Sequence, residues 1–273
     1  MTSSTAWLPV KMMIGGKLVA GEGQPITVRN PSTGEVTIEF AGASLDQTKA
    51  AIASARVAAD KGEWAAKPQK ERVAIVRDLL ARFTARHDDL RDLIVTETGM
   101  PIKSFALPAQ ISAPLAQMDV MLDLCLKLPE IEENPITLDE RINNMGGFVQ
   151  SIRRYVPVGV VAAISAYNFP LHINLWKLMP ALATGNCVIL RPSPLTPLSA
   201  LALAEIAAEA GLPEGVLSII AESGAEGAQL LTTDPAVNMV SFTGSTEVGS
   251  IVAGQAAPSM KRLQLELGGK SAQ

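Results

Sequence analysis

Cysteine and histidine are scarce in this sequence. Its 273 residues contain two cysteines, Cys125 and Cys187, and two histidines, His87 and His172. Two cysteines are too few for a disulfide framework and indicate a reducing compartment. Two histidines cannot assemble a histidine-rich metal site, so we predict no metal centre.

Long apolar runs and clusters of basic residues are also missing. No stretch approaches the roughly 20 apolar residues that span a bilayer, and the N-terminus shows no signal-peptide pattern. The net charge is −4 and no lysine or arginine cluster is present, which argues against nucleic acid as the main partner, while the missing apolar span argues against a membrane. The hydrophobic content of 48% with 18% charged residues is typical of a compact protein. We therefore expect a soluble, cytoplasmic protein.

From about residue 151 onward, short apolar runs alternate with helical patterns. The pattern predicts strands at 158–164, 187–190, 216–220, 239–243 and 263–267, separated by helices at 171–182, 198–210, 225–231 and 246–256. Such alternation predicts an α/β fold with a doubly wound parallel sheet. We divide the chain into an N-terminal part (1–128), an acidic arm (129–150) and a Rossmann-like core (151–273).

The glycine motifs that usually mark phosphate sites are absent. Gly268-Gly269-Lys270-Ser271 resembles the end of a P-loop, but Gln264 stands where that motif needs glycine. No G-x-G-x-x-G fingerprint follows the first core strand. The segment Phe242–Gly249 joins a strand to a helix, and Ser245 there can serve an anion at the helix N-terminus. Its alternative interpretation is a plain helix N-cap beside a packing glycine.

Two polar residues follow apolar strands. Asn168 comes just after the run 158–164, and the carboxyl edge of a central strand is where α/β sheets bind ligands. Its amide is suited to stabilising an oxyanion, although a turn asparagine is the alternative. Glu266 ends the last strand, where we expect partial desolvation that suits a general base. The alternative is an exposed edge-strand glutamate.

Together these segments resemble the NAD(P)-dependent aldehyde dehydrogenase superfamily. Three motifs carry the resemblance in order and spacing: Ala166–Pro170, Phe242–Gly249 and Leu265–Lys270. A fourth match is Trp176–Asn186, and Ile14–Gly16, Asn30–Glu35 and Glu97–Gly99 also fit. The resemblance covers nearly the whole chain.

The resemblance implies a two-step reaction. A cysteine thiolate attacks the aldehyde, hydride passes to the nicotinamide, and water hydrolyses the resulting thioester to a carboxylate. It implies that Asn168 is the oxyanion donor, Glu266 the general base and Lys177 a supporting residue. The implied cofactor is NAD, with NADP possible. The implied cofactor contacts are Ile164, Ser165, Ala166, Tyr167, Arg191, Ser193, Gly224, Phe242, Gly244, Ser245, Thr246, Val248, Gly249, Leu267 and Gly268.

The sequence departs from the family in several ways. The family's catalytic cysteine lies beyond the Glu266 motif, and Cys187 falls in an apolar strand where a structural thiol is expected. We therefore expect an N-terminal portion of a dehydrogenase that is inactive by itself. Arg191 stands where the family often has lysine, and Pro194 where it often has glutamate, which leaves NADP use more open. Tyr167 replaces the usual tryptophan.

Two other functions fit the same residues. The chain could be a non-catalytic nucleotide-binding or subunit-interaction fragment, because such a fragment would retain Asn168 and Glu266. It could also belong to a CoA-acylating enzyme, in which CoA accepts the acyl group. The resemblance further implies a small-molecule aldehyde substrate and a homo-dimer or homo-tetramer assembled with help from the arm.

Overall fold

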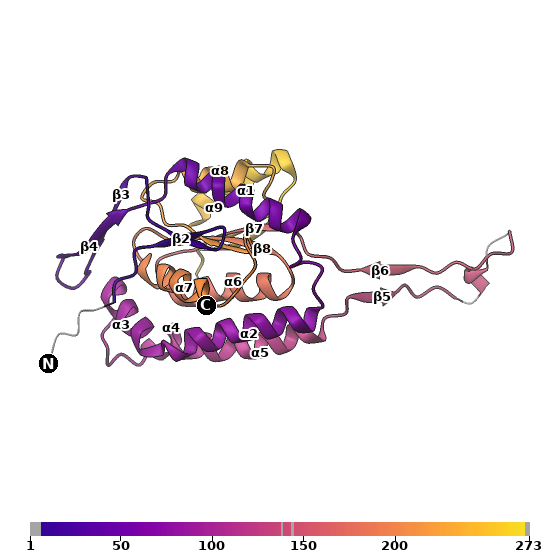
Figure 1. Ribbon diagram of the computed structural model, residues 1–273, viewed down its shortest axis with the longest axis horizontal. Coiled ribbons are helices and arrows are strands. Elements are labelled where there is room, and N and C mark those ends of the chain that lie inside the picture. Colours follow the sequence, from indigo (N-terminus) through magenta and orange to yellow (C-terminus); the bar gives the residue numbers. More distant parts are fainter. Residues whose placement is uncertain (1–6, 138, 143–144, 271–273) are drawn as a thin grey trace.

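The computed structural model describes residues 7–137, 139–142 and 145–270. In this part of the chain a seven-stranded sheet has the order β11-β10-β7-β8-β9-β1-β2 (Figure 1). Its strands are β1 (Met12–Ile14), β2 (Lys17–Val19), β7 (Val160–Ile164), β8 (Cys187–Arg191), β9 (Leu217–Ile219), β10 (Met239–Gly244) and β11 (Arg262–Leu267).

The five strands of the core are parallel, as the alternating pattern predicts. Every residue of β7, β8 and β9 is buried, which explains why these strands are apolar runs rather than alternating ones. Between them run α6 (Pro170–Ala183), α7 (Leu198–Ala208), α8 (Glu226–Thr233) and α9 (Thr246–Ala256). The predicted doubly wound parallel sheet is confirmed.

Helices cover both faces of the sheet (Figure 1). α8 and α9 lie on one face together with α1 (Leu45–Lys61), and α6 and α7 lie on the other. Beneath α6 and α7 lies an outer layer, formed mainly by α2 (Gln69–Ala85), α3 (His87–Thr98), α4 (Leu107–Gln110) and α5 (Ser112–Lys127). The core is continuous from this outer layer to the sheet, so residues 7–127 pack directly on residues 160–267.

The N-terminal region adds two antiparallel strands to the parallel sheet. β1 pairs with β2 through a turn at Gly15 and Gly16, and Met13 of β1 lies opposite Ile219 of β9. A separate hairpin joins β3 (Pro25–Arg29) to β4 (Val36–Ala41). Ser44 and Gln47 form a capping box at the start of α1, and Gly99 ends α3 in the left-handed conformation.

A two-stranded ribbon projects from the body (Figure 1). β5 (Ile131–Glu133) pairs antiparallel with β6 (Ile152–Arg154), and a short 3₁₀ helix (Asp139–Arg141) lies near its tip. Apolar side chains are exposed along it, among them Ile131, Phe148 and Val156. The predicted arm at 129–150 lies in this ribbon, and its residues 138, 143 and 144 lie outside the described part.

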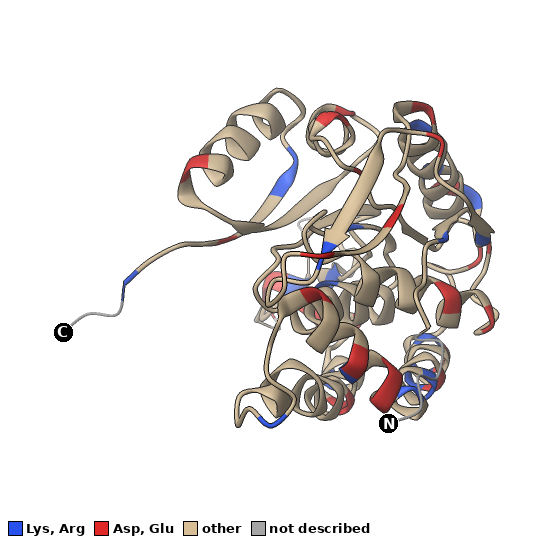
Figure 2. Ribbon diagram, turned by 90° about the vertical axis from the view of Figure 1, so that its left-hand side faces the viewer, with Lys and Arg blue, Asp and Glu red and all other residues tan. Residues whose placement is uncertain are grey.

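In the view of Figure 2, lysine and arginine residues are interspersed with aspartate and glutamate residues. None of the described helices is long and apolar enough to cross a membrane. In Figure 2 residues 268–270, which follow β11, extend away from the body.

Gly159 makes the entry to β7 possible. Its φ is +119°, and a Cβ there would lie 2.3 Å from Asn238 Oδ1. That oxygen accepts hydrogen bonds from the Val160 amide (2.9 Å) and from Arg56 Nη1 (2.7 Å), so it links α1 to the first core strand.

We predict that Gly159→Ala lowers the free energy of unfolding by about 1–3 kcal/mol, because it adds backbone strain and displaces Asn238. Urea titration measures the change. Gly254→Ala is the matched control, since no atom lies within 4 Å of a Cβ there and it lies inside α9. That variant should gain roughly 0.5–1 kcal/mol from helix propensity. Equal effects at the two positions would contradict the role assigned to Gly159.

Candidate cofactor-binding and active site

The chain reverses direction across the sheet between β7 and β10. From β7 it proceeds to β8 and β9 on one side, and it then returns to β10 and β11 on the other. β7 and β10 lie side by side with Phe242 opposite Ile164. Their adjacent carboxyl ends form the type of crevice in which open α/β sheets bind ligands.

A cavity of about 270 Å³ opens at this crevice between α8 and α9. The structure brings together here four of the predicted cofactor residues: Ile164, Arg191, Phe242 and Val248. The remaining lining residues come from the two helices and the N-cap of α8: Ala225, Ala228, Gln229, Thr232, Ile251, Val252 and Gln255. A largely apolar slot with a few polar groups suits a flat heteroaromatic ring. These helix residues escaped the sequence analysis because only the packing of α8 against α9 aligns them.

The N-terminus of α9 lies at the end of β10. Ser245 is the N-cap, and its hydroxyl accepts from the Val248 amide at 3.2 Å. A Cβ at Gly244 would lie 2.4 Å from the Phe242 ring, so glycine allows the close turn. The first-turn amides of Thr246 and Glu247 have no intrahelical acceptor and, with the helix dipole, favour an anion there. The N-cap interpretation therefore holds, and it is compatible with anion binding.

The end of β11 is joined to this helix terminus. The Thr246 hydroxyl donates to the Gly268 carbonyl at 3.4 Å. A Cβ at Gly249 would lie 2.5 Å from Leu267 Cδ2. The predicted residues Gly249, Leu267 and Gly268 are therefore neighbours of the helix N-terminus, although they do not line the cavity.

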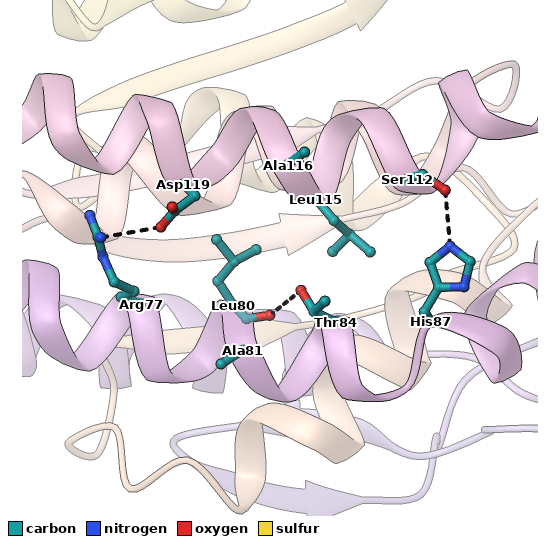
Figure 3. Close-up of a pocket in the computed structure, with 9 residues that line it drawn as sticks. All are labelled: Arg77, Leu80, Ala81, Thr84, His87, Ser112, Leu115, Ala116 and Asp119. Carbon is teal, nitrogen blue, oxygen red and sulfur yellow. Dashed lines mark hydrogen bonds and ion pairs between the residues drawn. The ribbon is translucent and has the colours of Figure 1, made fainter.

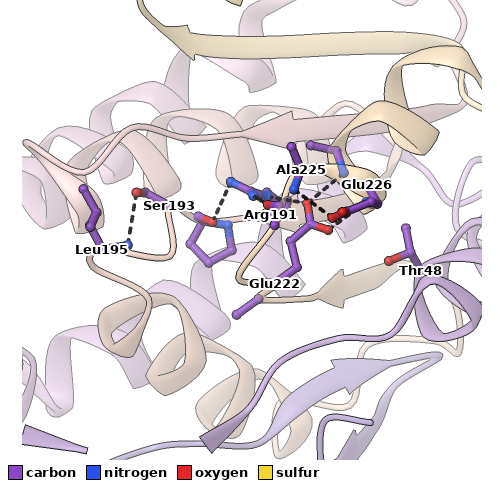
Figure 4. Close-up of polar contacts among 12 residues, drawn as sticks. Thr48, Arg191, Ser193, Leu195, Glu222, Ala225 and Glu226 are labelled. Atoms are coloured by element: carbon purple, nitrogen blue, oxygen red, sulfur yellow. Dashed lines mark hydrogen bonds and ion pairs between the residues drawn. The ribbon is translucent and has the colours of Figure 1, made fainter. Parts of the chain in front are cut away.

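Arg191 is held by a network that the sequence analysis missed (Figure 4). Its Nε donates to Glu222 Oε1 at 2.9 Å, and its Nη2 donates to the carbonyl of Gly224 at 2.6 Å. Both members of the ion pair are buried. Glu222 follows the apolar strand β9 as Asn168 follows β7, and this shared position is the signal that could have identified it. Ser193 is also buried, and its Oγ accepts from the Leu195 amide at 3.3 Å.

Asn168 follows β7 by four residues and is exposed. Its carbonyl accepts from Gln110 Nε2 at 3.0 Å, which fixes the backbone and leaves the side-chain amide exposed. Of the preceding residues, Ala166 is half-buried, the carbonyl of exposed Tyr167 accepts from Thr196, and the buried Ser165 hydroxyl donates to Asn174 Oδ1 at 2.6 Å. The Ser165 amide also donates to the Arg191 carbonyl at 3.1 Å, so the Ser165 carbonyl is the group left for a ligand.

Lys177 reaches from α6 to the sheet. Its Nζ donates to Ser241 Oγ at 2.8 Å, and Ser241 donates to Gln264 Oε1 at 3.1 Å. Burial lowers the pKa of Lys177 to about 8, while the nearby Glu266 carboxylate acts in the opposite direction. The lysine therefore lies close enough to Glu266 for the two charges to interact electrostatically.

Glu266 itself is exposed, so the expectation of partial desolvation is wrong. The reason is topological. β11 is the edge strand and pairs only with β10, and five of its six residues are exposed in the chain described here. Its place beside Thr243 of β10 keeps it next to the crevice.

Both cysteines are buried, and neither lines the cavity at the crevice. Burial raises the pKa of Cys187, in β8, to about 11, and it also raises the pKa of Cys125. A thiol with a raised pKa is a poor nucleophile at neutral pH. Among the described residues, no group of three or more histidine, cysteine or acidic side chains is arranged to hold a metal ion.

A groove of about 520 Å³ lies elsewhere, between α2 and α5 (Figure 3). Its polar groups pair with one another: Arg77 with Asp119 at 3.3 Å, and His87 Nε2 with Ser112 Oγ at 3.0 Å. It contains none of the predicted site residues.

Comparison with known proteins identifies the family. Residues 18–273 match the model of the aldehyde dehydrogenase family. The chain belongs to the aldehyde dehydrogenase family. It is 36% identical over 268 residues to a phenylacetaldehyde dehydrogenase of Pseudomonas fluorescens, a match that covers 97% of this chain and 52% of the relative.

Solved structures of the family show the same fold. A Mycobacterium tuberculosis aldehyde dehydrogenase complexed with NAD+ has a TM-score of 0.86 and 38% identity, with 96% of this chain and 52% of that chain covered. An NADP-dependent enzyme of E. coli has a TM-score of 0.87 and 32% identity, covering 97% of this chain and 52% of that one. The chain thus spans about half the length of the family members it matches.

The lowered pKa of Lys177 makes a prediction about stability. Below pH 8 the lysine is charged in both the folded and the unfolded chain. Between its folded pKa of about 8 and its ordinary value of 10.5, the folded chain loses the proton first and the unfolded chain binds more protons. Stability contributed by this site therefore rises with pH across that window, by at most about 1.4 kcal/mol per unit.

The free energy of unfolding of the wild type, relative to Lys177→Met, should consequently increase from pH 7.5 to 9.5. Urea unfolding at several pH values measures it. The same replacement at the exposed Lys49 controls for the loss of a lysine. If the difference in unfolding free energy between the wild type and Lys177→Met does not change with pH, folding does not lower the pKa of Lys177.

Proposed function

We propose that this chain forms the cofactor-binding part of an NAD(P)-dependent aldehyde dehydrogenase, which oxidises an aldehyde to a carboxylate. The observation that carries the proposal is the crevice between β7 and β10, where an apolar slot, a helix N-terminus and the exposed amide of Asn168 lie at one sheet edge. The family membership and the NAD+ and NADP in the names of related structures support it.

The residues at the crevice fit a dinucleotide. The slot between α8 and α9 would hold the adenine, with Val248 and Phe242 against the ring. The N-terminus of α9, with Gly244, Ser245 and Thr246, would hold the pyrophosphate. Arg191, Ser193 and Gly224 would border the adenosine ribose, and residues 164–167 would form the wall that leads toward the nicotinamide. The remaining contacts proposed are Gly249, Leu267 and Gly268. When bound, the cofactor supplies the hydride acceptor.

The polar residues around the crevice have distinct proposed roles. The Asn168 amide would donate a hydrogen bond to the oxygen that becomes negative when a thiolate adds to the aldehyde. The Glu266 carboxylate would take a proton from the water that hydrolyses the thioester. Lys177 touches neither group in the structure and would position β10 and β11 through Ser241.

The nucleophile is not one of the two cysteines of this sequence. Both are buried with raised pKa values, and Cys187 is 1% exposed within β8. We therefore propose that the thiolate is supplied from outside these 273 residues and that the chain alone has no dehydrogenase activity. A purely non-catalytic binding role for this chain remains compatible with the same residues.

Assembly and location are also proposals. The ribbon of β5 and β6 exposes Phe148 (81%) and Val156 (71%), and such apolar side chains on a projecting arm favour a homo-oligomer. The substrate would be a small aldehyde, as the name of the phenylacetaldehyde dehydrogenase relative suggests. The absence of a disulfide framework in the sequence supports a cytoplasmic location.

Cofactor binding is the direct test. The purified chain should bind NAD in isothermal titration calorimetry. Ala228→Phe should weaken binding at least about tenfold, because its ring fills the slot. Val120→Phe, on the exposed side of α5, is the matched control and should bind NAD as the wild type does. Failure of the wild type to bind either NAD or NADP would contradict the proposed function.

Turnover tests the assignment of the nucleophile. The pure chain with NAD or NADP and phenylacetaldehyde should produce no NADH or NADPH, since neither thiol reaches a substrate. Absorbance of the reduced nicotinamide measures this. Sustained reduction that disappears in the Cys187→Ser variant would show that the buried thiol is the nucleophile after all.

A further inference from the structure

We infer that Glu222, through its buried ion pair with Arg191, makes this chain prefer NAD to NADP. The inference rests on the proposed function, because it concerns the adenosine end of the proposed cofactor site. Glu222 is a positioning residue here: it acts through Arg191, which lines the slot, whereas Glu222 does not.

Each of the three guanidinium nitrogens of Arg191 donates a hydrogen bond within the protein. Its Nε donates to Glu222 Oε1 (2.9 Å), its Nη1 to the Pro192 carbonyl (3.3 Å) and its Nη2 to the Gly224 carbonyl (2.6 Å). A guanidinium has five N–H groups, so two remain for a ligand. These two N–H groups can donate to the ribose hydroxyls of NAD, an interaction that needs no net positive charge at the site.

The Glu222 carboxylate is also held by hydrogen bonds from backbone amides (Figure 4). Oε1 also accepts from the Ala228 amide at 2.8 Å, and Oε2 accepts from the Gly227 amide at 2.7 Å. The carboxylate therefore accepts hydrogen bonds from the N-terminus of α8 as well as from the guanidinium of Arg191. A Cβ at Gly227 would lie 2.6 Å from Oε2 and 2.9 Å from Thr48 Oγ1, so the packing leaves the carboxylate little room to move.

The charge balance follows from these contacts. Glu222 balances the charge of Arg191, and the Glu226 carboxylate offsets the partial positive charge of the same helix terminus. A 2′-phosphate, which carries between about one and a half and two negative charges, would meet a neutral floor. The neighbouring residues 192–195 are Pro-Ser-Pro-Leu and add no cation. NADP would lose the attraction that an unpaired arginine offers, while NAD needs only hydrogen bonds.

A second carboxylate lies at the same helix terminus. Glu226 is exposed, and its Oε2 accepts from the Ala225 amide at 3.0 Å rather than from Arg191. It provides a matched control, because its replacement removes the same charge from the same turn without releasing the guanidinium.

The experiment compares NAD and NADP affinities by isothermal titration calorimetry at constant salt. The wild-type chain should bind NAD at least about tenfold more tightly than NADP. Glu222→Gln, which keeps the shape but leaves Arg191 charged, should shift the affinity ratio toward NADP by about tenfold or more. The double variant Arg191→Gln/Glu222→Gln should lose that gain, because the released charge is gone. Glu226→Gln should shift the ratio less than about threefold.

Several outcomes overturn the inference: a wild type without preference for NAD, a ratio unchanged in Glu222→Gln, a gain that persists in the double variant, or an equal gain in Glu226→Gln. If circular dichroism shows that Glu222→Gln does not fold, Glu222→Met replaces it, since it also removes the charge at similar volume and should shift the ratio in the same direction. A wild type that binds neither dinucleotide refutes the proposed function. NAD binding with an unaltered ratio refutes only the role of Glu222.

Discussion

The pairing of β7 with β10 is the interaction on which the rest of the structure depends. These strands are far apart in the sequence, and their parallel register places Ile164 opposite Phe242. Because both strands end at the same edge, the turn that carries Asn168 and the N-terminus of α9 are brought to one edge of the sheet. Every proposed role in cofactor binding presupposes this single register, since a shift by one residue would turn the side chains of β10 to the other face of the sheet.

Buried charge organises the floor of the same crevice. Arg191 and Glu222 lie in a region where an isolated ion would be costly, so each requires the other and both require backbone partners. The carboxylate caps α8 while the guanidinium ties β8 to the β9–α8 connection, through Gly224. One ion pair thus joins three elements, and removal of its charge from either side alone would change both local packing and the electrostatic character of the ligand site.

Lys177 and Glu266, both residues of the candidate site, differ in how much protein surrounds them. Lys177 is enclosed by α6 and β10, and this burial lowers its pKa to about 8. Glu266, one strand further out, lies on the sheet edge and is exposed. The change from buried to exposed follows the strand order, because Lys177 lies over the inner strand β10 whereas Glu266 lies on the edge strand β11.

The sequence alone determined the parallel sheet, its helices and the segments that carry chemistry, because buried parallel strands are continuous apolar runs and helix starts have local signals such as Ser44 with Gln47. It also placed Asn168 and Ser245 at strand ends. Tertiary structure alone decided that β1 and β2 extend the sheet, that Glu266 is exposed, and that Glu222 neutralises Arg191. These features depend on which strands become neighbours, and residues 31 positions apart, such as Arg191 and Glu222, leave no mark of their contact in local spacing.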